Sequence, residues 1–512
     1  MRYLYHTTIV CVVFCFHLHA QVLYVNSVKG NDNNMGNAWP KAFKTLSKAL
    51  QKANADMGVS TIMLTNGKYY PSGSISLTSE NRDSSFLITR GGLKIFGGFD
   101  PTTHLLNKND STILIGNGCN HVLVIADINA NADSIVLNNL TVTGGFAKAS
   151  EAQKNNNQRL PITRGGGICL INNKNDGKIS LQNCTVENNR ASEGGGIFIS
   201  HSSPSIINCS FIGNRVSDLG GAAIFNEGGA PQIINCNFRH NGEGMNGGAF
   251  YHVADNGTEQ VKIISSIFTD NIVDQLGAGI YAEKGSFYIA NCIFSGNESF
   301  SRTEGTGGGG GIYFAGVSAT ITNTTFCGNK VAGAAGAGIF VEKSQLTISN
   351  CTFSGNNSKY GAALCSRGSP TDIKVFNSIL YGNSSSIEQF GDGKLAINYS
   401  IVDGWGNGFD NHNSDPLFVN APTFANAPFC DFKGGHANYA LFDYHLKAGS
   451  LAIDTGNNNC YATAGGKLTD CDLSGKKRFY GSTIDLGAYE FQEVGQAPEK
   501  NTTDSNITDG VK

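Results

Sequence analysis

Several familiar chemical signatures are missing from this 512-residue chain. It has no Gly-x-Ser-x-Gly elbow for a serine nucleophile, no His-Glu-x-x-His helix for zinc, no Cys-x-x-Cys pair and no phosphate-binding glycine loop. Only 15% of the residues are charged, and 37 basic against 40 acidic residues give a formal charge of −3. The composition therefore excludes a broad basic field for nucleic acid.

The chain also lacks a long apolar run. Beyond the N-terminus no segment reaches the roughly 18 apolar residues that a membrane-spanning helix needs. The first residues combine Arg2, an apolar run from Ile9 to Phe16, and Ala20, which is typical of a secretory signal. We therefore expect cleavage after Ala20 and an exported mature chain, either secreted or associated with the cell surface or outer membrane. How such a chain would be anchored stays open.

A cassette of asparagine, cysteine and a bulky apolar residue recurs about once every 25 to 32 residues, a period typical of a solenoid. The clearest copies begin at Asn183, Asn208, Asn235, Asn291, Asn323 and Asn350, and looser ones at Asn139, Ser265, Asn377 and Asn398. A glycine cluster running into an apolar residue precedes most copies, as from Gly194 to Ile197. The 65 glycines exceed the average share of about 7%, and repeated corners explain the excess.

The spacing inside a cassette fixes which side chains point inward. A β-strand alternates its side chains, yet Leu181 is out of phase with Cys184 and Val186. A bend at Asn183 restores the phase, so these three side chains should be buried and Thr185 should face outward. The next cassette repeats this pattern with Ile206, Cys209, Phe211 and Ser210. Each unit then consists of a strand, an asparagine bend, a strand, a turn ending in a second asparagine, a glycine corner and a third strand.

Such units stack about 4.8 Å apart, so equivalent residues form ladders. The sequence therefore predicts an all-β, right-handed parallel β-helix of roughly ten coils, about 50 Å long, with the hand taken from the general rule for parallel crossovers. An open solenoid exposes strand edges and needs caps. Residues 40–55 predict a helical N-terminal cap, because Phe43, Leu46, Ala49, Leu50 and Ala53 share one helical face.

These features divide the chain into six parts. They are a signal peptide at 1–20, an N-terminal cap with the first coils at 21–145, a loop insertion at 146–164, the repeat β-helix at 165–404, an irregular C-terminal cap at 405–491 and a polar tail at 492–512.

The paired Gly-Gly-Ala-Ile and Phe-x-x-Asn motifs resemble the repeat of the chlamydial-type polymorphic outer membrane proteins, over about residues 165–383. The opening, from Tyr24-Val25-Asn26 to Trp39-Pro40, looks like that of many secreted β-helix proteins, among them polysaccharide lyases. The stretches 415–418, 443–454, 469–472 and 484–490 look like the end of the choice-of-anchor Q surface proteins, with an insertion at 421–442. The resemblance implies a pectate-lyase-like solenoid at the cell surface, but it says little about activity.

Fourteen cysteines fall to twelve when the signal is removed. Most lie on the inward ladder, where cysteine behaves as a small buried hydrophobe, and stacked side chains need not have the torsion of a disulfide. We expect free, packed thiols there. Cys460 and Cys471 flank a loop outside the repeat and are the better candidates for a disulfide in an exported protein.

Catalytic signatures are scarce. The Asn-Thr-Asp, Asp-Asp and Gly-His-Gly signatures of β-helix pectinases are missing. A polysaccharide lyase stays open, since it needs only a base and neutralisation of a uronate, often by Ca²⁺. Asp470 and Asp472 begin a calcium-loop pattern, but Gly481 stands at the twelfth position, where a carboxylate is needed. A turn held by side-chain caps is the favoured interpretation, so no cofactor is expected, with Ca²⁺ as the one alternative.

One cluster of charged residues is a candidate binding site. Arg190 and Arg215 follow the turn asparagine on consecutive coils, while Arg239 and His240 come just before it on the next coil, beside Glu187. Stacking would bring them within about 10 Å of one another along one edge. The more common meaning of such a cluster is a set of solvated turn residues. The alternative is a contact for an anionic glycan, or the base and neutralising group of a lyase.

Two functions follow as hypotheses. The first is a non-catalytic adhesin or glycan-binding scaffold, and the second is a polysaccharide lyase that acts on acidic, uronate-containing glycans. The missing pectinase signatures and the resemblance to surface proteins favour the first. Tyr251, Tyr281 and Tyr313 offer either sugar-stacking faces or core residues. A polysaccharide or a host-surface ligand is the expected partner, and the oligomeric state stays open.

Overall fold

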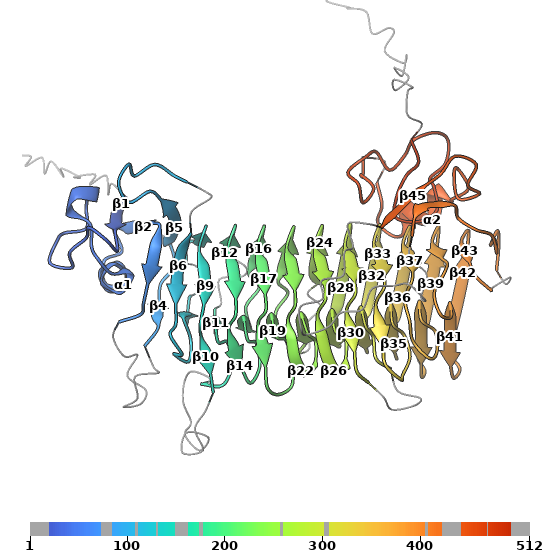
Figure 1. Cartoon of the computed structure of the whole chain (residues 1–512), viewed down its shortest axis with the longest axis horizontal. Coiled ribbons are helices and arrows are strands. Elements are labelled where there is room, and N and C mark those ends of the chain that lie inside the picture. Colours follow the sequence, from blue (N-terminus) through green and yellow to red (C-terminus); the bar gives the residue numbers. More distant parts are fainter. Residues whose placement is uncertain are drawn as a thin grey trace, which may run out of the picture.

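The described part of the chain is one long stack of parallel strands (Figure 1). The computed structural model describes residues 20–72, 84–107, 111–129, 132–148, 162–173, 178–255, 260–301, 307–404, 408–421, 442–467 and 469–492. Within them, every strand pair of the stack is parallel, and strands that are neighbours in a sheet come from successive coils. The predicted parallel β-helix is confirmed.

Four sheets make up the stack, numbered here by size. Sheet 1 contains β1 (Gln21–Val25), β2 (Val59–Thr65), β5 (Lys94–Phe99), β8 (Ile135–Asn138), β12 (Ile179–Gln182), β16 (Ser205–Ile207), β20 (Gln232–Ile234), β24 (Gln260–Ile264), β28 (Ser286–Ala290), β32 (Ser318–Thr322), β36 (Gln345–Ser349), β39 (Asp372–Phe376) and β42 (Lys394–Asn398). Sheet 2 contains β3 (Gly67–Tyr69), β6 (Thr112–Ile115), β9 (Thr141–Thr143), β13 (Thr185–Glu187), β17 (Ser210–Ile212), β21 (Asn237–Arg239), β25 (Ile267–Thr269), β29 (Ile293–Ser295), β33 (Thr325–Cys327), β37 (Thr352–Ser354), β40 (Ile379–Leu380) and β43 (Ile401–Val402).

The other two sheets complete the coil. Sheet 3 contains β4 (Phe86–Ile88), β7 (Leu123–Ala126), β11 (Ile168–Ile171), β15 (Ile197–Ser200), β19 (Ile224–Glu227), β23 (Phe250–Val253), β27 (Ile280–Glu283), β31 (Ile312–Ala315), β35 (Ile339–Glu342), β38 (Leu364–Arg367) and β41 (Ile387–Phe390). Sheet 4 contains β10 (Phe146–Ala147), β14 (Arg190–Ala191), β18 (Arg215–Val216), β22 (Gly242–Asn246), β26 (Ile272–Leu276), β30 (Glu298–Ser299) and β34 (Lys330–Val331). Sheet 4 is not among the three expected sides. It forms because the segment after each sheet 2 strand pairs with the equivalent segment of the neighbouring coil.

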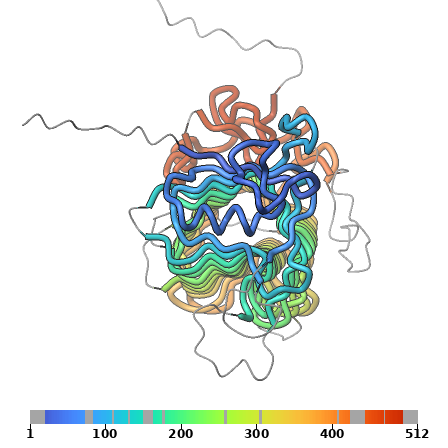
Figure 2. Tube along the Cα trace, turned by 90° about the vertical axis from the view of Figure 1, so that its left-hand side faces the viewer, coloured from blue at the N-terminus to red at the C-terminus, as the bar shows by residue number. Residues whose placement is uncertain are grey.

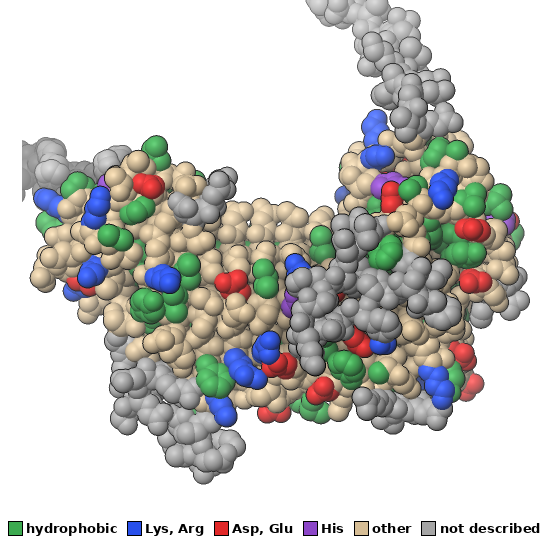
Figure 3. Space-filling view, viewed as in Figure 1, with side chains coloured by type: hydrophobic (Ala, Val, Ile, Leu, Met, Phe, Trp, Pro, Cys, Tyr) green, Lys and Arg blue, Asp and Glu red, His purple; other side chains and the backbone are tan. Residues whose placement is uncertain are grey.

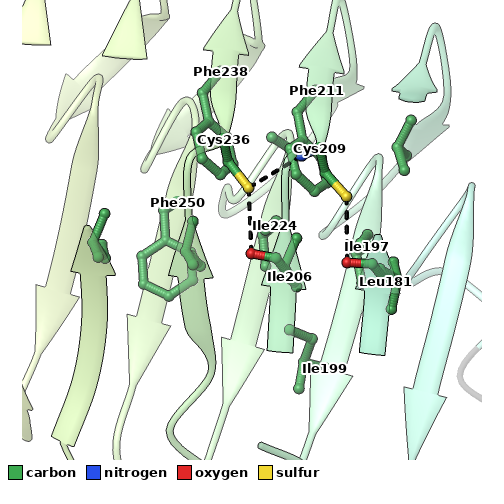
Figure 4. Packing of buried hydrophobic residues seen from close by; sticks show 14 of the residues in the cluster. Leu181, Ile197, Ile199, Ile206, Cys209, Phe211, Ile224, Cys236, Phe238 and Phe250 are labelled. Atoms are coloured by element: carbon green, nitrogen blue, oxygen red, sulfur yellow. Dashed lines mark hydrogen bonds between the residues drawn. The ribbon is translucent and has the colours of Figure 1, made fainter. Parts of the chain in front are cut away.

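The bend at the cassette asparagine sets the register of the core. Asn183 has a positive φ of 53°, which asparagine tolerates better than most residues. Leu181, Cys184 and Val186 are buried, while Thr185 on the same strand is partly exposed. The next coil repeats the arrangement, and Figure 4 shows Cys209 and Cys236 beside Phe211 and Phe238 with Ile206 below them. The predicted register and the predicted free thiols of this ladder are therefore confirmed.

Two buried ladders tie the coils together. The rings from Phe211 to Phe353 stack with centroids 4.6–4.9 Å apart. The second asparagine of each coil is also buried: Asn214 donates its side-chain amide to Val186 O (2.8 Å) and to Asn241 Oδ1 (3.1 Å). The same pattern runs through Asn189, Asn214, Asn241, Asn271, Asn297, Asn329 and Asn356. This ladder satisfies polar backbone groups at a corner where strands cannot.

The glycine corners are required for two different reasons. Gly194 has a φ of 63°, a conformation that other residues rarely adopt. Gly195 has ordinary backbone angles, but a Cβ there would lie 2.4 Å from the carbonyl oxygen of Arg215 on the next coil. A side chain at Gly195 would therefore be disfavoured by contact with the next coil and not by the backbone conformation.

The N-terminal end is closed by α1 (Leu46–Ala55), preceded by a short 3₁₀ helix at Trp39–Lys41. The predicted face of α1, Leu46, Ala49, Leu50 and Ala53, is buried, and Thr45 caps the helix by accepting a hydrogen bond from Lys48 N. Figure 2, viewed along the stack, shows the superimposed coils with this cap, in dark blue, in front of them. The predicted helical cap is thus confirmed.

The chain after β43 is used in two ways. Residues 408–412 extend the last coil, since His412 N donates to Ser400 O and Val402 N to His412 O. The C-terminal segment, residues 442–491, contains β45 (Asp443–Leu446), which pairs with β44 (Phe418–Asn420), and α2 (Asn458–Thr463). It lies on the side of the stack, above β33 and β37 (Figure 1), and packs on apolar residues of sheet 2 such as Ile379 and Ile401. It therefore covers a flank of the coils, where the sequence predicted an end cap.

Parts of the predicted organisation lie outside the described residues. They are residues 1–19 of the expected signal peptide, most of the 146–164 and 421–442 insertions, and the tail from 493. Among the described helices, none has the length and apolar character needed to cross a membrane.

Candidate functional site

The candidate charged residues surround one corner of the coil, between sheets 2 and 4. The buried amides of Asn189 and Asn214 fix this corner: Asn189 N and Nδ2 both donate to Asn214 Oδ1, at 3.2 and 3.1 Å. The residue after each asparagine begins a strand of sheet 4 and points outward. The rigid ladder beneath therefore holds Arg190 and Arg215 in register, and the two residues are paired across β14 and β18.

Arg190 and Arg215 share one carboxylate. Arg190 Nη2 lies 3.0 Å from Glu243 Oε2, and Arg215 Nη1 contacts Glu243 Oε1. The two arginine side chains are about half exposed, at 51% and 48%, against 26% for Glu243. Each carboxylate oxygen therefore takes one guanidinium, and the three groups together keep one net positive charge.

Glu243 is not among the candidate residues that the sequence indicated. It lies in a bulge of β22, where the pairing register shifts between Gly242 and Gly244, and its φ is +71°. A positive φ at a non-glycine residue costs about 1 kcal/mol or more, and such strain gathers at functional sites. The only available signal was its position, one residue beyond the Gly242 that takes the place of Arg190 and Arg215 on the third coil.

Glu187, Arg239 and His240 lie on the other side of the same corner. Glu187 and Arg239 occupy equivalent positions of β13 and β21, with Ile212 between them. His240 has a φ of 55° and its Nε2 lies 3.8 Å from Asp270 Oδ2, a buried carboxylate. The structure thus brings Arg190 and Arg215 together, and places the other three candidates across the buried asparagines.

The three tyrosines belong to a second aromatic core. Tyr251, Tyr281 and Tyr313 stack on the outer face of sheet 3, with ring centroids 4.7 and 5.5 Å apart, and each is at most 9% exposed. Tyr313 donates its hydroxyl to Glu342 Oε2 at 2.9 Å. These rings are core residues, so the stacking face for a sugar that the sequence allowed is not available on them.

Asp470 and Asp472 hold turns with their side chains. Asp472 Oδ1 accepts from Ser474 N, Ser474 Oγ and Lys476 N, and Asp470 Oδ2 accepts from Tyr461 OH at 2.9 Å. In the described residues no group of three or more His, Cys, Asp or Glu side chains is arranged to hold a metal ion. The arrangement matches the capped-turn interpretation of this sequence.

The proposed Cys460–Cys471 disulfide is wrong, since both thiols are free. The two segments do meet, but through the neighbours of the cysteines, Tyr461 and Asp470. Cys460 precedes Tyr461 on α2 and so points about 100° away from it around the helix. Cys471 follows Asp470 in an extended bridge with Lys477 and therefore points to the opposite side.

The comparisons identify the architecture. Residues 128–326 and 221–415 match a family model described as "Right handed beta helix region", which agrees with the predicted hand. Comparison with curated proteins gave no match. Among solved structures, pectate lyase Pel9A is 14% identical over 92% of this chain and 96% of its own, with a TM-score of 0.43. XylC in complex with xylose is 8% identical over 92% and 99% (TM-score 0.39), and a GH136 lacto-N-biosidase from Eubacterium ramulus is 9% identical over 74% and 68% (TM-score 0.34).

Proposed function

Since the chain belongs to the family of right-handed β-helix proteins, we propose that it is an exported scaffold that binds acidic glycans without cleaving them. The observation that carries the proposal is the pair of half-exposed guanidiniums at Arg190 and Arg215. They already bind the two oxygens of one carboxylate, that of Glu243. A uronate presents the same group, and arginine is suited to paired contacts with it. The signal-like residues 1–20 support export.

In the part of the chain that the structure describes, the predicted base does not lie beside the arginine pair. The arginine pair is suited to neutralising a uronate, but a lyase also requires a base within hydrogen-bonding reach of the proton to be removed. His240, the candidate base, lies across the corner asparagines and near the buried Asp270. A polysaccharide lyase remains the alternative function, because the neutralising pair itself would serve that chemistry.

Polygalacturonate is a suitable probe, with binding measured by calorimetry and cleavage by the absorbance of unsaturated uronates. Arg190→Ala with Arg215→Ala should weaken binding about tenfold, which corresponds to about 1.4 kcal/mol. Glu243→Gln should strengthen binding, because it removes the internal competitor and keeps the side-chain shape. Lys262→Ala, an exposed cation on sheet 1, is the control and should bind as the wild type does.

Two further measurements complete the test: the salt dependence of binding and the formation of unsaturated uronates. Wild-type binding should weaken with added salt, since exposed charges are screened over about 8 Å at physiological ionic strength. Adding Arg239→Ala and His240→Ala to the double variant tests the far side of the corner. Equal binding by the wild type and the double variant would remove the arginine pair as the site. Absorbance that grows with the wild type and is lost in Arg215→Ala or His240→Ala would establish the lyase instead.

A further inference from the structure

A second surface runs along the stack, over the bend asparagines between sheets 1 and 2. In Figure 1 this side forms a saddle between two raised ends, the N-terminal cap on the left and the C-terminal segment on the right. We call the exposed row Asn183, Asn208 and Asn235, with Thr185 and Ser210 beside it, the asparagine saddle. Figure 3 shows the surface between the raised ends almost wholly in the colour of uncharged polar side chains and backbone.

The saddle presents hydrogen-bonding groups at regular intervals. Asn235 Nδ2 donates to Asn208 Oδ1 at 2.8 Å, and Asn208 Nδ2 donates to Asn183 Oδ1 at 3.2 Å. Each amide carries two N–H groups and two carbonyl lone pairs, so this ladder uses only half of its capacity. The outward half repeats at the spacing of the coils, about 4.8 Å.

Farther along the stack, the C-terminal segment covers the same row of bend asparagines. The hydrogen bonds there show which chemical groups these asparagines can bind. Asn323 Nδ2 donates to Tyr461 OH (2.9 Å), Asn350 Nδ2 to Asp485 O (2.9 Å), and Asn377 Nδ2 to Asn457 O (3.0 Å). Asn377 Oδ1 also accepts from Asn457 N at 2.8 Å. The bend asparagines therefore bind a hydroxyl group and the C=O and N–H groups of secondary amides.

The described residues that line the saddle and the groove at its end are uncharged. A groove of about 390 Å³ lies at its N-terminal end, bounded by Leu106 and Ser111 on one side and by Asn138, Thr141 and Asn183 on the floor. Toward the C-terminal segment the floor becomes apolar, because the partly exposed Ile207, Ile234 and Ile264 continue the line of Gln182 across sheet 1. An occupant should thus carry hydroxyls, amides and small apolar groups, but no charge.

We propose that the asparagine saddle binds a strand of an uncharged, N-acetylated polysaccharide that lies along the axis of the stack. Its acetamido group is a secondary amide with a methyl group, and its other substituents are hydroxyls. A pyranose residue in an extended glycan advances by nearly one coil, whereas an extended peptide advances 3.3–3.4 Å per residue and falls out of step with the ladder. The site is independent of Arg190 and Arg215, which lie at a different corner.

The test uses chitotetraose as the uncharged N-acetylated probe, and cellotetraose as the same backbone without acetamido groups, with calorimetry on the full chain. Asn183→Gly, Asn208→Gly and Asn235→Gly together remove the amides while keeping the positive φ that glycine tolerates. The matched control is Asn188→Gly, an exposed asparagine with the same φ of 53° as Asn183, at the other corner of its coil.

The proposal expects chitotetraose to bind more tightly than cellotetraose, the triple variant to lose at least tenfold in affinity, and Asn188→Gly to lose nothing. Polygalacturonate binding by the triple variant should equal that of the wild type, which separates this site from the arginine pair. Undiminished chitotetraose binding by the triple variant overturns the proposal. So does a wild type that binds a synthetic peptide of residues 482–491 in preference to chitotetraose, since that result would make the saddle a polypeptide-docking surface.

Discussion

Replacing Asn241 by alanine should destabilise the solenoid far more than an ordinary polar substitution. Asn241 is 1% exposed, and its Oδ1 accepts from both Asn214 N and Asn214 Nδ2 at 3.1 Å. Its Nδ2 donates to Phe211 O at 2.9 Å and to Asn271 Oδ1 at 3.0 Å. The change therefore leaves the buried Asn214 N–H and one side-chain N–H of Asn214 without partners, and it removes one of the hydrogen bonds to the Phe211 carbonyl, which stays in the β17–β21 ladder.

The magnitude follows from these orphaned groups. Each buried polar group left unpaired costs about 1–3 kcal/mol, so the two unpaired donors predict a loss of about 2–6 kcal/mol in the free energy of unfolding. Asn271 Oδ1 keeps its bond from Asn241 N, so that side of the ladder is less affected. Because each coil contacts only its neighbours, the damage should centre on the coils of Asn214 and Asn241.

Urea unfolding followed by circular dichroism measures the loss, and hydrogen exchange locates it. The control is Asn237→Ala in the same coil, a partly exposed residue whose replacement should change stability by less than about 0.5 kcal/mol. Protection should fall for the amides of Asn214 and its neighbours, while that of β36 stays as in the wild type. If Asn241→Ala were no more destabilising than Asn237→Ala, the asparagine ladder would not be what holds the corners.

Three further outcomes test other parts of the structure. Gly195→Val should lower the melting temperature and cost well over 1 kcal/mol, because its Cβ would meet the Arg215 carbonyl of the next coil, and an unchanged melting temperature would contradict the corner assignment. Burial lowers the pKa of His252 to about 4, so stability should fall by about 3 kcal/mol as the pH drops from 6.5 to 4 while only the unfolded chain takes up the proton. His252→Gln should flatten this part of the stability curve measured by urea unfolding at each pH, and an equally steep curve would show that other groups cause it. Among the described cysteines, a maleimide should label the exposed Cys471 first and Cys292 only on unfolding, since burial raises the pKa of Cys292 to about 12. Mass spectrometry measures the order of labelling, and labelling of Cys292 before Cys471 in the folded protein would contradict this prediction.

The repeating part of the fold could be predicted from the sequence because its determinants are local. The phase break between Leu181 and Cys184 requires a bend, and Asn183 is a residue that tolerates one. Every coil repeats this residue pattern, so a wrong assignment at one cassette is corrected by the others. The free thiols of the Cys184 ladder and the buried face of α1 follow from the same periodicity.

The features that escaped prediction depend on contacts between distant residues. Glu243 meets Arg190 and Arg215 only because a bulge in β22 breaks the repeat that made the arginines visible. Likewise, the C-terminal segment lies on the flank of the stack through bonds such as that from Asn350 to Asp485, 135 residues away. No local pattern specifies such a docking position, and the same holds for the separation of Cys460 from Cys471.

The coils differ in length while their ladders stay in register: successive corner asparagines are 25, 27, 30, 26, 32 and 27 residues apart from Asn189 to Asn356. The strands of neighbouring coils keep their pairing despite these differences in length. Evolution can therefore lengthen a loop, or duplicate or delete a whole coil, without redesigning the core. Duplication or deletion of a coil would change the length of the exposed asparagine row by one step of about 4.8 Å. Relatives of this chain should accordingly differ in the length of the stack by whole numbers of coils.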